Sequence, residues 1–351
     1  MITYGKFANP NPDRPELTNS VCQIFSARKN TNFVDNGLGG SLMEKKILLA
    51  VDDSIHSKHA IQYAVRMSSA VKDLTFTLFH VQPAISQFLL DEAKTAFKAN
   101  AELKKVIRKN TKHAQGILEK FKAQMVRMGI DGKHIEVATQ PKLLGLAKDV
   151  LDRAQQGLYD AIAVGRRGLS RVQKTFVGSV TAKLVEHSTT TPVWVIDGNV
   201  TSTRIMVAVD GSETSLRAVD HLSFMIGGNP KVRLTLFHVI PKLRDYCVID
   251  FEGRETGVEQ VIARGDRRCI EDFYAHARRI LQDAGIQDKQ VEIRTAKRKS
   301  NPAKAIVEEA RKGDYGTVVV GRRGRGKAFF MGSVSRYVLD RTSNRALWLV
   351  S

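Results

Sequence analysis

The chain has 351 residues, of which 42% are hydrophobic and 26% are charged. This length suits two domains of about 150 residues each, and the composition is that of an ordinary soluble globular protein. No apolar run approaches the roughly 18 residues of a membrane-spanning helix, and three scattered cysteines argue against a disulfide framework. We therefore expect a cytoplasmic protein without a membrane partner.

The net charge of +19 is spread along the chain. Residues 43–198 carry 24 Lys and Arg against 15 Asp and Glu, and residues 199–351 carry 27 against 18, which excludes a dedicated basic tail. Such a charge favours anionic partners, or it simply keeps the surface soluble. No aromatic residue interleaves the basic run 297–299, so nucleic-acid binding is not expected there.

The predicted elements begin after an atypical N-terminal segment. Residues 1–42 lack apolar periodicity and are rich in Asn, Pro and Gly. They are predicted to be a disordered or mis-assigned extension, with Met43 as the alternative start. Strands are then predicted near 45–52, 74–82, 134–139, 160–165 and 192–197, and helices near 54–70, 90–128, 142–156 and 178–188. Nearly continuous apolar strands separated by helices predict an open, doubly wound parallel five-stranded sheet of Rossmann-like type.

The second half repeats the first. Residues 47–54 (ILLAVDDS) match residues 205–212 (IMVAVDGS), and 78–81 (LFHV) match 236–239 (LFHV), both at an offset of 158. Trp194 matches Trp348 at an offset of 154. The shared order and spacing predict two domains of the same α/β fold, 43–198 and 199–351.

A glycine pattern follows the fourth predicted strand of each half. The first copy reads Gly165-x2-Gly168-x9-Gly178-Ser179, and the helix predicted from Val180 comes directly after it. Glycines let a backbone approach an anion closely, and a helix N-terminus offers unpaired N–H donors. Strand, glycine loop and helix start together predict a phosphate site. If the first and fourth strands are neighbours, Asp52 faces the same crevice.

These residues resemble the universal stress protein family in its tandem form. The resemblance covers residues 43–351 and rests on Val51-Asp52-x-Ser54, His80-Val81 and the glycine spacing. It implies the adenine nucleotide α-hydrolase-like fold and ATP as the ligand, with or without Mg²⁺. In the first half it implies adenine and ribose contacts from Asp52 and Val81, and phosphate contacts from Gly165, Gly168, Gly178, Ser179 and Val180.

The second half keeps the matching positions but shortens the loop. Seven residues, not nine, separate Gly324 from Gly332. Nucleotide binding there is left open; the residues concerned are Asp210, Val239, Gly321, Gly324, Gly332, Ser333 and Val334.

Several residues have a structural reading beside the functional one. Asp52 suits helix capping as well as ligand contact, although Ser54 can cap the helix instead. Arg166 either grips phosphate or lies at a solvated loop tip. His80 and His238 are expected to be core histidines with hydrogen-bond partners, and His56 and His59 are not expected to bind a metal.

Three functions remain possible on these residues. The first is a nucleotide-dependent regulatory or stress-adaptation factor, and the stress role follows from the resemblance alone. The others are a slow ATP hydrolase and a basic nucleic-acid-binding protein. No dedicated catalytic residue is predicted. The resemblance also implies an internal pseudo-dimer through the strands of Trp194 and Trp348, and a homodimer of such chains is a further possibility.

Overall fold

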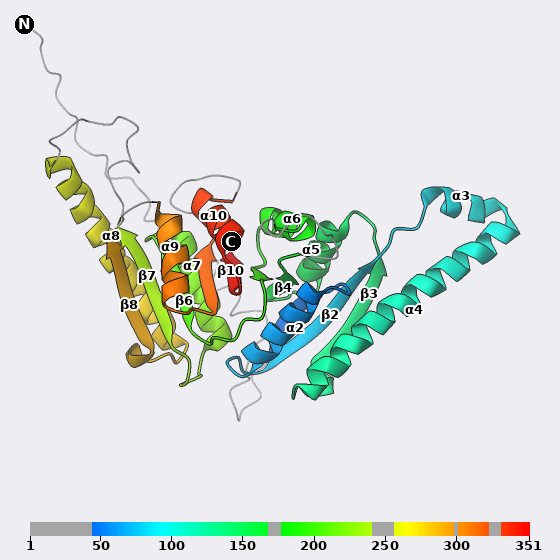
Figure 1. The fold of residues 1–351 in the computed structure, drawn as a ribbon, viewed down its shortest axis with the longest axis horizontal. Helices are drawn as coiled ribbons and strands as arrows, with labels where there is room; N and C mark the ends of the chain where they lie inside the picture. The colour runs from blue at the N-terminus through cyan, green and yellow to red at the C-terminus, as the bar shows by residue number, and fades with distance from the viewer. Residues whose placement is uncertain (1–43, 168–176, 241–255, 298–300, 323–330) are drawn as a thin grey trace, which may run out of the picture. The chain divides into compact units, whose positions relative to one another are not determined.

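The computed structural model describes residues 44–167, 177–240, 256–297, 301–322 and 331–351 (Figure 1). The N-terminal extension 1–42 and two of the predicted site residues, Gly168 and Gly324, lie outside these ranges. The description below concerns the compact unit Met43–Ser351.

The first half alternates strands and helices, as its apolar pattern predicts. Its elements are β1 (Lys45–Ala50), α2 (Ile55–Ser68), β2 (Leu74–Gln82), α3 (Gln87–Thr95), α4 (Phe97–Arg127), the short 3₁₀ helix η1 (Gly132–His134), β3 (Ile135–Pro141), α5 (Leu146–Gln156), β4 (Ala161–Gly165), α6 (Ser179–His187) and β5 (Val193–Ile196).

The helix expected near 90–128 is two helices. Ala96 adopts extended dihedral angles (φ −112°, ψ 118°), so α3 ends there and α4 begins. The Asn100 side chain donates to the Ala93 carbonyl at 3.3 Å, which satisfies one of the carbonyls that the break leaves without an intrahelical partner. Alanine favours helices, so local propensity gives no sign of this break.

The second half repeats the order of elements. They are β6 (Ile205–Val209), α7 (Glu213–Ile226), β7 (Leu234–Ile240), α8 (Thr256–Asp283), the 3₁₀ helix η3 (Asp288–Gln290), β8 (Val291–Lys297), α9 (Pro302–Lys312), β9 (Thr317–Gly321), α10 (Ser333–Arg341) and β10 (Ala346–Val350).

The strands form one ten-stranded sheet in the order β3-β2-β1-β4-β5-β10-β9-β6-β7-β8. All neighbours within each half are parallel, whereas β5 and β10 pair antiparallel at the centre. Two five-stranded sheets of the same topology are therefore joined edge to edge, which removes the exposed edge that each last strand would otherwise present.

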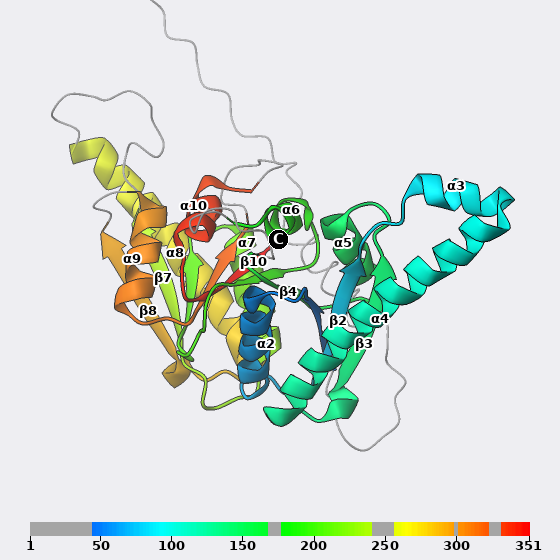
Figure 2. The ribbon, with the colours of Figure 1, turned by 45° about the vertical axis from the view of Figure 1, so that its right-hand side comes forward.

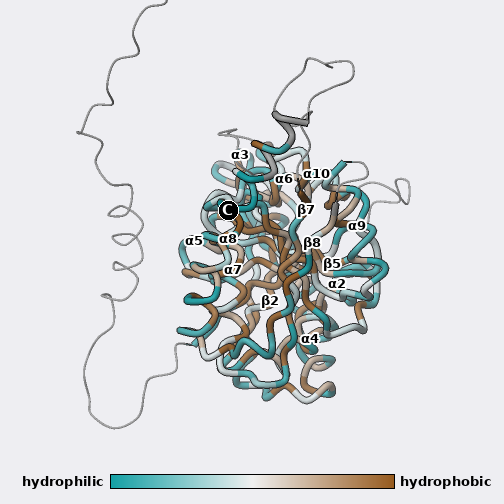
Figure 3. The backbone as a smooth tube through the Cα atoms, turned by 90° about the vertical axis from the view of Figure 1, so that its left-hand side faces the viewer, coloured by the Kyte–Doolittle hydropathy of each residue, from teal (hydrophilic) through white to brown (hydrophobic). Residues whose placement is uncertain are grey.

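Each face of the sheet carries its own core. One core packs α2, α4, α7 and α8 against the strands, and the other packs α5, α6, α9 and α10. Figure 2 brings α2 and α4 in front of the strands, and Figure 3 shows hydrophobic residues concentrated along the central strands. Neighbouring strand residues such as Leu48 and Leu49 point into opposite cores, which explains why the strands read as continuous apolar runs.

Two stacked tryptophans lie at the centre of the sheet. Trp194 and Trp348 are opposite each other in the β5–β10 register, fully buried, with ring centroids 3.9 Å apart and planes 2° from parallel. Trp194 Nε1–H donates to His221 Nε2 at 3.2 Å, and Trp348 Nε1–H donates to the Tyr63 hydroxyl at 2.9 Å. Each indole thus bonds a helix of the opposite half, α7 or α2.

Candidate functional site

Strands β1 and β4 end side by side, at the point where the strand order reverses. They pair in parallel with Ala50 opposite Val164, and the helices that follow them, α2 and α6, cover opposite faces. Ligands of open α/β sheets bind beyond the carboxyl ends of strands at such a point. The neighbouring positions assumed from the sequence are confirmed, so Asp52 and Gly165 follow adjoining strand ends, and the region beyond these ends is called the crevice below. Strands β6 and β9 repeat the arrangement.

The two aspartates of the site also organise the turn into the next helix. The Ser57 hydroxyl donates to Asp52 Oδ1 at 2.6 Å, and the Ser54 N–H approaches the same oxygen at 3.2 Å. Ser54 itself is the N-cap of α2, accepting from the Ser57 N–H. In the second half, Asp210 Oδ1 accepts from the hydroxyl and the N–H of Ser212. Both aspartates are half-buried, each held in a fixed orientation at the edge of the crevice.

The main chain of Val81 points toward the crevice. The Phe79 carbonyl accepts the Val51 N–H at 2.9 Å, so it faces β1. Main-chain groups two residues apart on a strand point the same way, and therefore the N–H and C=O of Val81 face the space beyond the end of β1. Val239 occupies the matching place on β7. Each therefore has one main-chain donor and one main-chain acceptor at this end of the sheet.

The neighbouring histidines have main-chain partners. His80 Nδ1 lies 2.8 Å from the Val51 carbonyl, and His238 Nδ1 lies 3.0 Å from the Val209 carbonyl. His238 is 2% exposed, and its Nε2 lies 2.9 Å from Asp266 Oδ2. The prediction that these histidines have hydrogen-bond partners is confirmed, with His238 in the core and His80 half-buried.

The ends of the first glycine loop are tied together. The Gly178 N–H donates to the Arg166 carbonyl at 2.9 Å, and the Thr181 hydroxyl donates to the Gly165 carbonyl at 2.9 Å. A Cβ on Gly165 would lie 2.7 Å from the backbone of His56, so glycine is needed where β4 meets the first turn of α2. The strand end and the helix start are thereby held at a fixed separation.

The ends of the second glycine loop are tied together in the same way, and each such pair of hydrogen bonds at a loop base is called a neck below. The Gly332 N–H donates to the Arg322 carbonyl at 2.9 Å, and the Ser335 hydroxyl donates to the Gly321 carbonyl at 2.7 Å. A Cβ on Gly321 would come within 3.0 Å of the Thr214 backbone in the first turn of α7. The loop that is two residues shorter thus has the same anchoring geometry at its base.

Helices α6 and α10 begin at glycines without a side-chain cap. Gly178 and Gly332 are the N-cap residues, and neither helix start has a side-chain hydrogen bond to its cap. Their φ values are −60° and −63°, which any residue adopts, so the backbone conformation does not require glycine. The first amides, those of Ser179 and Val180 and of Ser333 and Val334, have no acceptor within the helix and lie at its positive end. This arrangement suits a phosphate group.

Arg166 requires a correction, because the structure gives it neither of the predicted roles. Its side chain is 4% exposed. The guanidinium donates to the Thr342 carbonyl and, at 2.6 Å, to the Asp340 carbonyl, both at the end of α10 in the other half. Burial lowers the pKa of Arg166, opposed by Asp197, whose carboxylate lies 3.8 Å away. Arg166 is therefore neither at a solvated tip nor directed at a phosphate.

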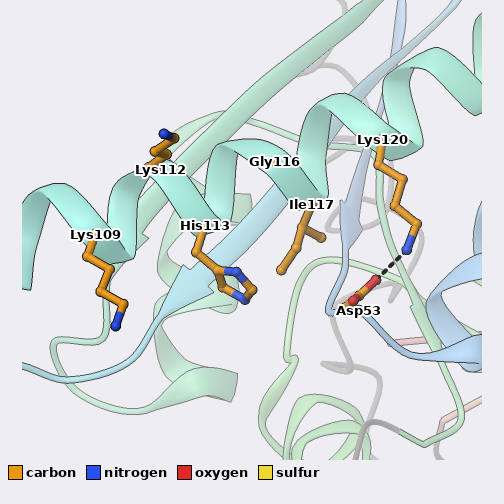
Figure 4. A pocket seen from close by; sticks show the side chains of 7 residues that line it. All are labelled: Asp53, Lys109, Lys112, His113, Gly116, Ile117 and Lys120. Atoms are coloured by element: carbon orange, nitrogen blue, oxygen red, sulfur yellow. Dashed lines mark hydrogen bonds and ion pairs between the residues drawn. The ribbon is translucent and has the colours of Figure 1, made fainter.

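A basic cavity of about 490 Å³ lies beside the crevice, between α4 and the loop after β1 (Figure 4). Lys120 pairs with Asp53 across it at 2.6 Å, and Lys109 and Lys112 add further positive charge along the helix. The sequence analysis did not predict this cavity, although the spacing of these lysines along a long basic helix could have indicated it.

The described residues contain no group of three or more His, Cys, Asp and Glu side chains that could hold a metal ion. Nor does that part of the chain include a helix both long and apolar enough to cross a membrane. His56 and His59 have lowered pKa values, primarily because burial disfavours their charged forms.

The fold is that of a tandem α/β protein with two parallel half-sheets of the same strand order. Comparison with protein families matches the universal stress protein family over residues 43–197 and again over 201–347. The chain therefore belongs to the universal stress protein family. Comparison with curated proteins finds no match.

Solved structures with a similar fold include other chains of this size. A universal stress protein from Archaeoglobus fulgidus DSM 4304 is 20% identical with a TM-score of 0.59, covering 87% of this chain and 97% of its own. A functionally unknown protein from Pseudomonas aeruginosa PAO1 is 17% identical with a TM-score of 0.52, covering 88% and 92%. A universal stress protein described in complex with cAMP is 25% identical, covering 42% of this chain and 97% of its own, with a TM-score of 0.32.

Proposed function

We propose that this chain binds ATP at the sheet-end crevice of each half and acts as a nucleotide-dependent regulatory factor in stress adaptation. The observation that carries the proposal is the repeated neck, in which a strand-end glycine and an uncapped helix start are tied together beside a fixed aspartate.

In this proposal the Val81 main chain contacts the adenine, and the Asp52 carboxylate contacts the ribose. The amides of Ser179 and Val180 bind the phosphates, with Gly178 leaving room for their approach. Gly165 and Gly168 shape the loop. Asp210, Val239, Gly321, Gly324, Gly332, Ser333 and Val334 take the same roles in the second half. The helix dipoles and the lysines of the neighbouring cavity favour a polyanionic ligand over adenosine alone.

Binding rather than turnover is the proposed activity. Efficient phosphoryl transfer needs a positioned base and charge stabilisation of the transferred group. Arg166, the arginine closest to the first neck, is instead directed into the other half. Its position favours a regulatory role over a slow hydrolase, and release of inorganic phosphate from ATP distinguishes the two.

We further propose a cytoplasmic protein in which the halves act as an internal pseudo-dimer through β5 and β10. Whether two such chains form a homodimer is measured by light scattering. A nucleic-acid-binding function predicts a steep dependence of affinity on salt, whereas mononucleotide binding depends on salt more weakly.

Calorimetric titration of ATP into the wild type and two neighbouring aspartate variants tests the site. Asp52→Ala is expected to weaken binding about tenfold, because a charge-assisted contact to the ligand is lost. Asp53→Ala is the matched control, since it removes the neighbouring carboxylate that pairs with Lys120 in the basic cavity and is therefore not expected to weaken binding of an anionic ligand. Equal affinities for the wild type and Asp52→Ala, or a larger loss in Asp53→Ala, would contradict the proposal.

Gly178→Ala gives a second test of the same site. The φ of −60° accepts alanine without strain, so a loss of affinity reports a methyl group that blocks phosphate. Gly265→Ala is its control, because a Cβ there meets no atom within 4 Å. Unchanged affinity in Gly178→Ala would place the phosphates elsewhere.

A further inference from the structure

Two buried arginines connect the halves reciprocally. Arg166, next to the neck of the first loop, donates to the Thr342 and Asp340 carbonyls at the end of α10. Arg322, next to the neck of the second loop, donates through Nη1 to the Val185 and Glu186 carbonyls at the end of α6, at 3.0 and 2.6 Å. The arginines are 4% and 1% exposed.

These contacts stabilise the ends of the two helices. The last four carbonyls of a helix have no intrahelical donor, and positive charge is favourable at that end. A guanidinium bonded there satisfies both needs, and burial shields it from solvent. Arg166 therefore helps to hold α10, and Arg322 helps to hold α6, although each belongs to the opposite half.

The helices held in this way are those that begin at the proposed phosphate sites. Helix α6 starts at Gly178 and ends on Arg322, while α10 starts at Gly332 and ends on Arg166. Both arginines also accept, through their own carbonyls, the N–H of the N-cap glycine of their own half. The hydrogen bonds thus connect the base of each loop, through a helix, to the base of the other loop. Helices α6 and α10 lie next to each other on one face of the sheet (Figures 1 and 2).

We propose that Arg166 and Arg322 are positioning residues that couple the two nucleotide sites. Each arginine fixes the helix that presents phosphate-binding amides in the opposite half, so occupancy of one site favours the binding-competent geometry of the other. This inference rests on the proposed function for its ligand. Hydrogen-bond networks and rigid helices such as these can carry coupling between two sites, and couplings of about fivefold to 150-fold in affinity are typical.

The positioning role is tested without nucleotide, by hydrogen exchange of the full chain. Arg322→Met is expected to speed exchange in residues 179–187 about fivefold and to leave 333–341 unchanged, and Arg166→Met is expected to do the reverse. Arg345→Met is the matched control, because Arg345 donates to the Ala310 and Ser343 carbonyls of its own half. The positioning role is overturned if exchange rises only in the helix of the half that carries the substitution, if it rises equally in both helices, or if it rises in neither.

The coupling is tested by titrating ATP into the wild type and into Asp210→Ala, whose second site is expected to bind about tenfold more weakly, each with and without Arg322→Met. Lower occupancy of the second site is expected to lower affinity at the first site about fivefold to tenfold, and Arg322→Met is expected to remove this difference. Arg322→Lys, which keeps the charge and one donor, is expected to restore part of it. If the wild type binds no ATP, the proposed function is refuted, and the hydrogen-exchange experiment by itself then tests the positioning role of the arginines. ATP affinity that is indifferent to Arg322 overturns the coupling.

Discussion

Replacing Trp194 by alanine tests whether the two halves unfold as one unit through the centre of the sheet. Trp194 is fully buried, stacks on Trp348 and donates to His221. Truncating a buried tryptophan costs about 3–5 kcal/mol in all, and this loss includes the stacking contribution of about 0.5–1.5 kcal/mol from the aromatic pair. At about 2 °C per kcal/mol, the melting temperature should fall by about 6–10 °C.

Differential scanning calorimetry measures both the size of this loss and its cooperativity. The wild type should unfold in one transition, since one core spans both halves, and Trp194→Ala should broaden or split it. Phe76→Ala is the control, because Phe76 is 1% exposed in β2, away from the β5–β10 junction. An unchanged transition in Trp194→Ala, or equal splitting in Phe76→Ala, would refute the reasoning.

Three further predictions concern the surroundings of the crevice and the junction. Gly165→Ala should destabilise the chain by about 1–3 kcal/mol, measured by urea unfolding, because its Cβ meets the His56 backbone at 2.7 Å; an unchanged midpoint would contradict this contact. Tyr63→Phe should cost about 1–3 kcal/mol in the same assay by leaving the buried Trp348 N–H without its acceptor, and a neutral effect would argue against that bond. NMR titration of His56 and His59 should give pKa values below 6.5 because burial disfavours the charged rings. Their depressed values mean that the unfolded chain binds more protons, so stability should fall as the pH drops below 6.5, and a pKa at or above 6.5 would disprove it.

The repeat and the alternation of strands and helices follow from local sequence patterns, whereas the neighbouring positions of the first and fourth strands were assumed and are confirmed by the sheet order. Gly165 was identified from its spacing, and the structure adds a second reason for it, its contact with the α2 backbone. The capping role of Ser54 also follows from its place before an apolar helix. A helix cap is predictable because the interaction that decides it lies within a few residues.

Arg166 shows where sequence reasoning fails. An arginine between glycines fits a phosphate loop locally, but its actual acceptors are 174 and 176 residues away. The same holds for the bond between Trp348 and Tyr63, 285 residues apart. These contacts depend on how two repeats meet, and no pattern within one repeat records that geometry.

A crystal structure of the chain grown with ATP tests the central claim most directly. The account predicts triphosphate on the amides of Ser179 and Val180, with the ribose at Asp52. Nucleotide bound instead along Lys109 and Lys112, or none in the crevice at millimolar ATP, would contradict it.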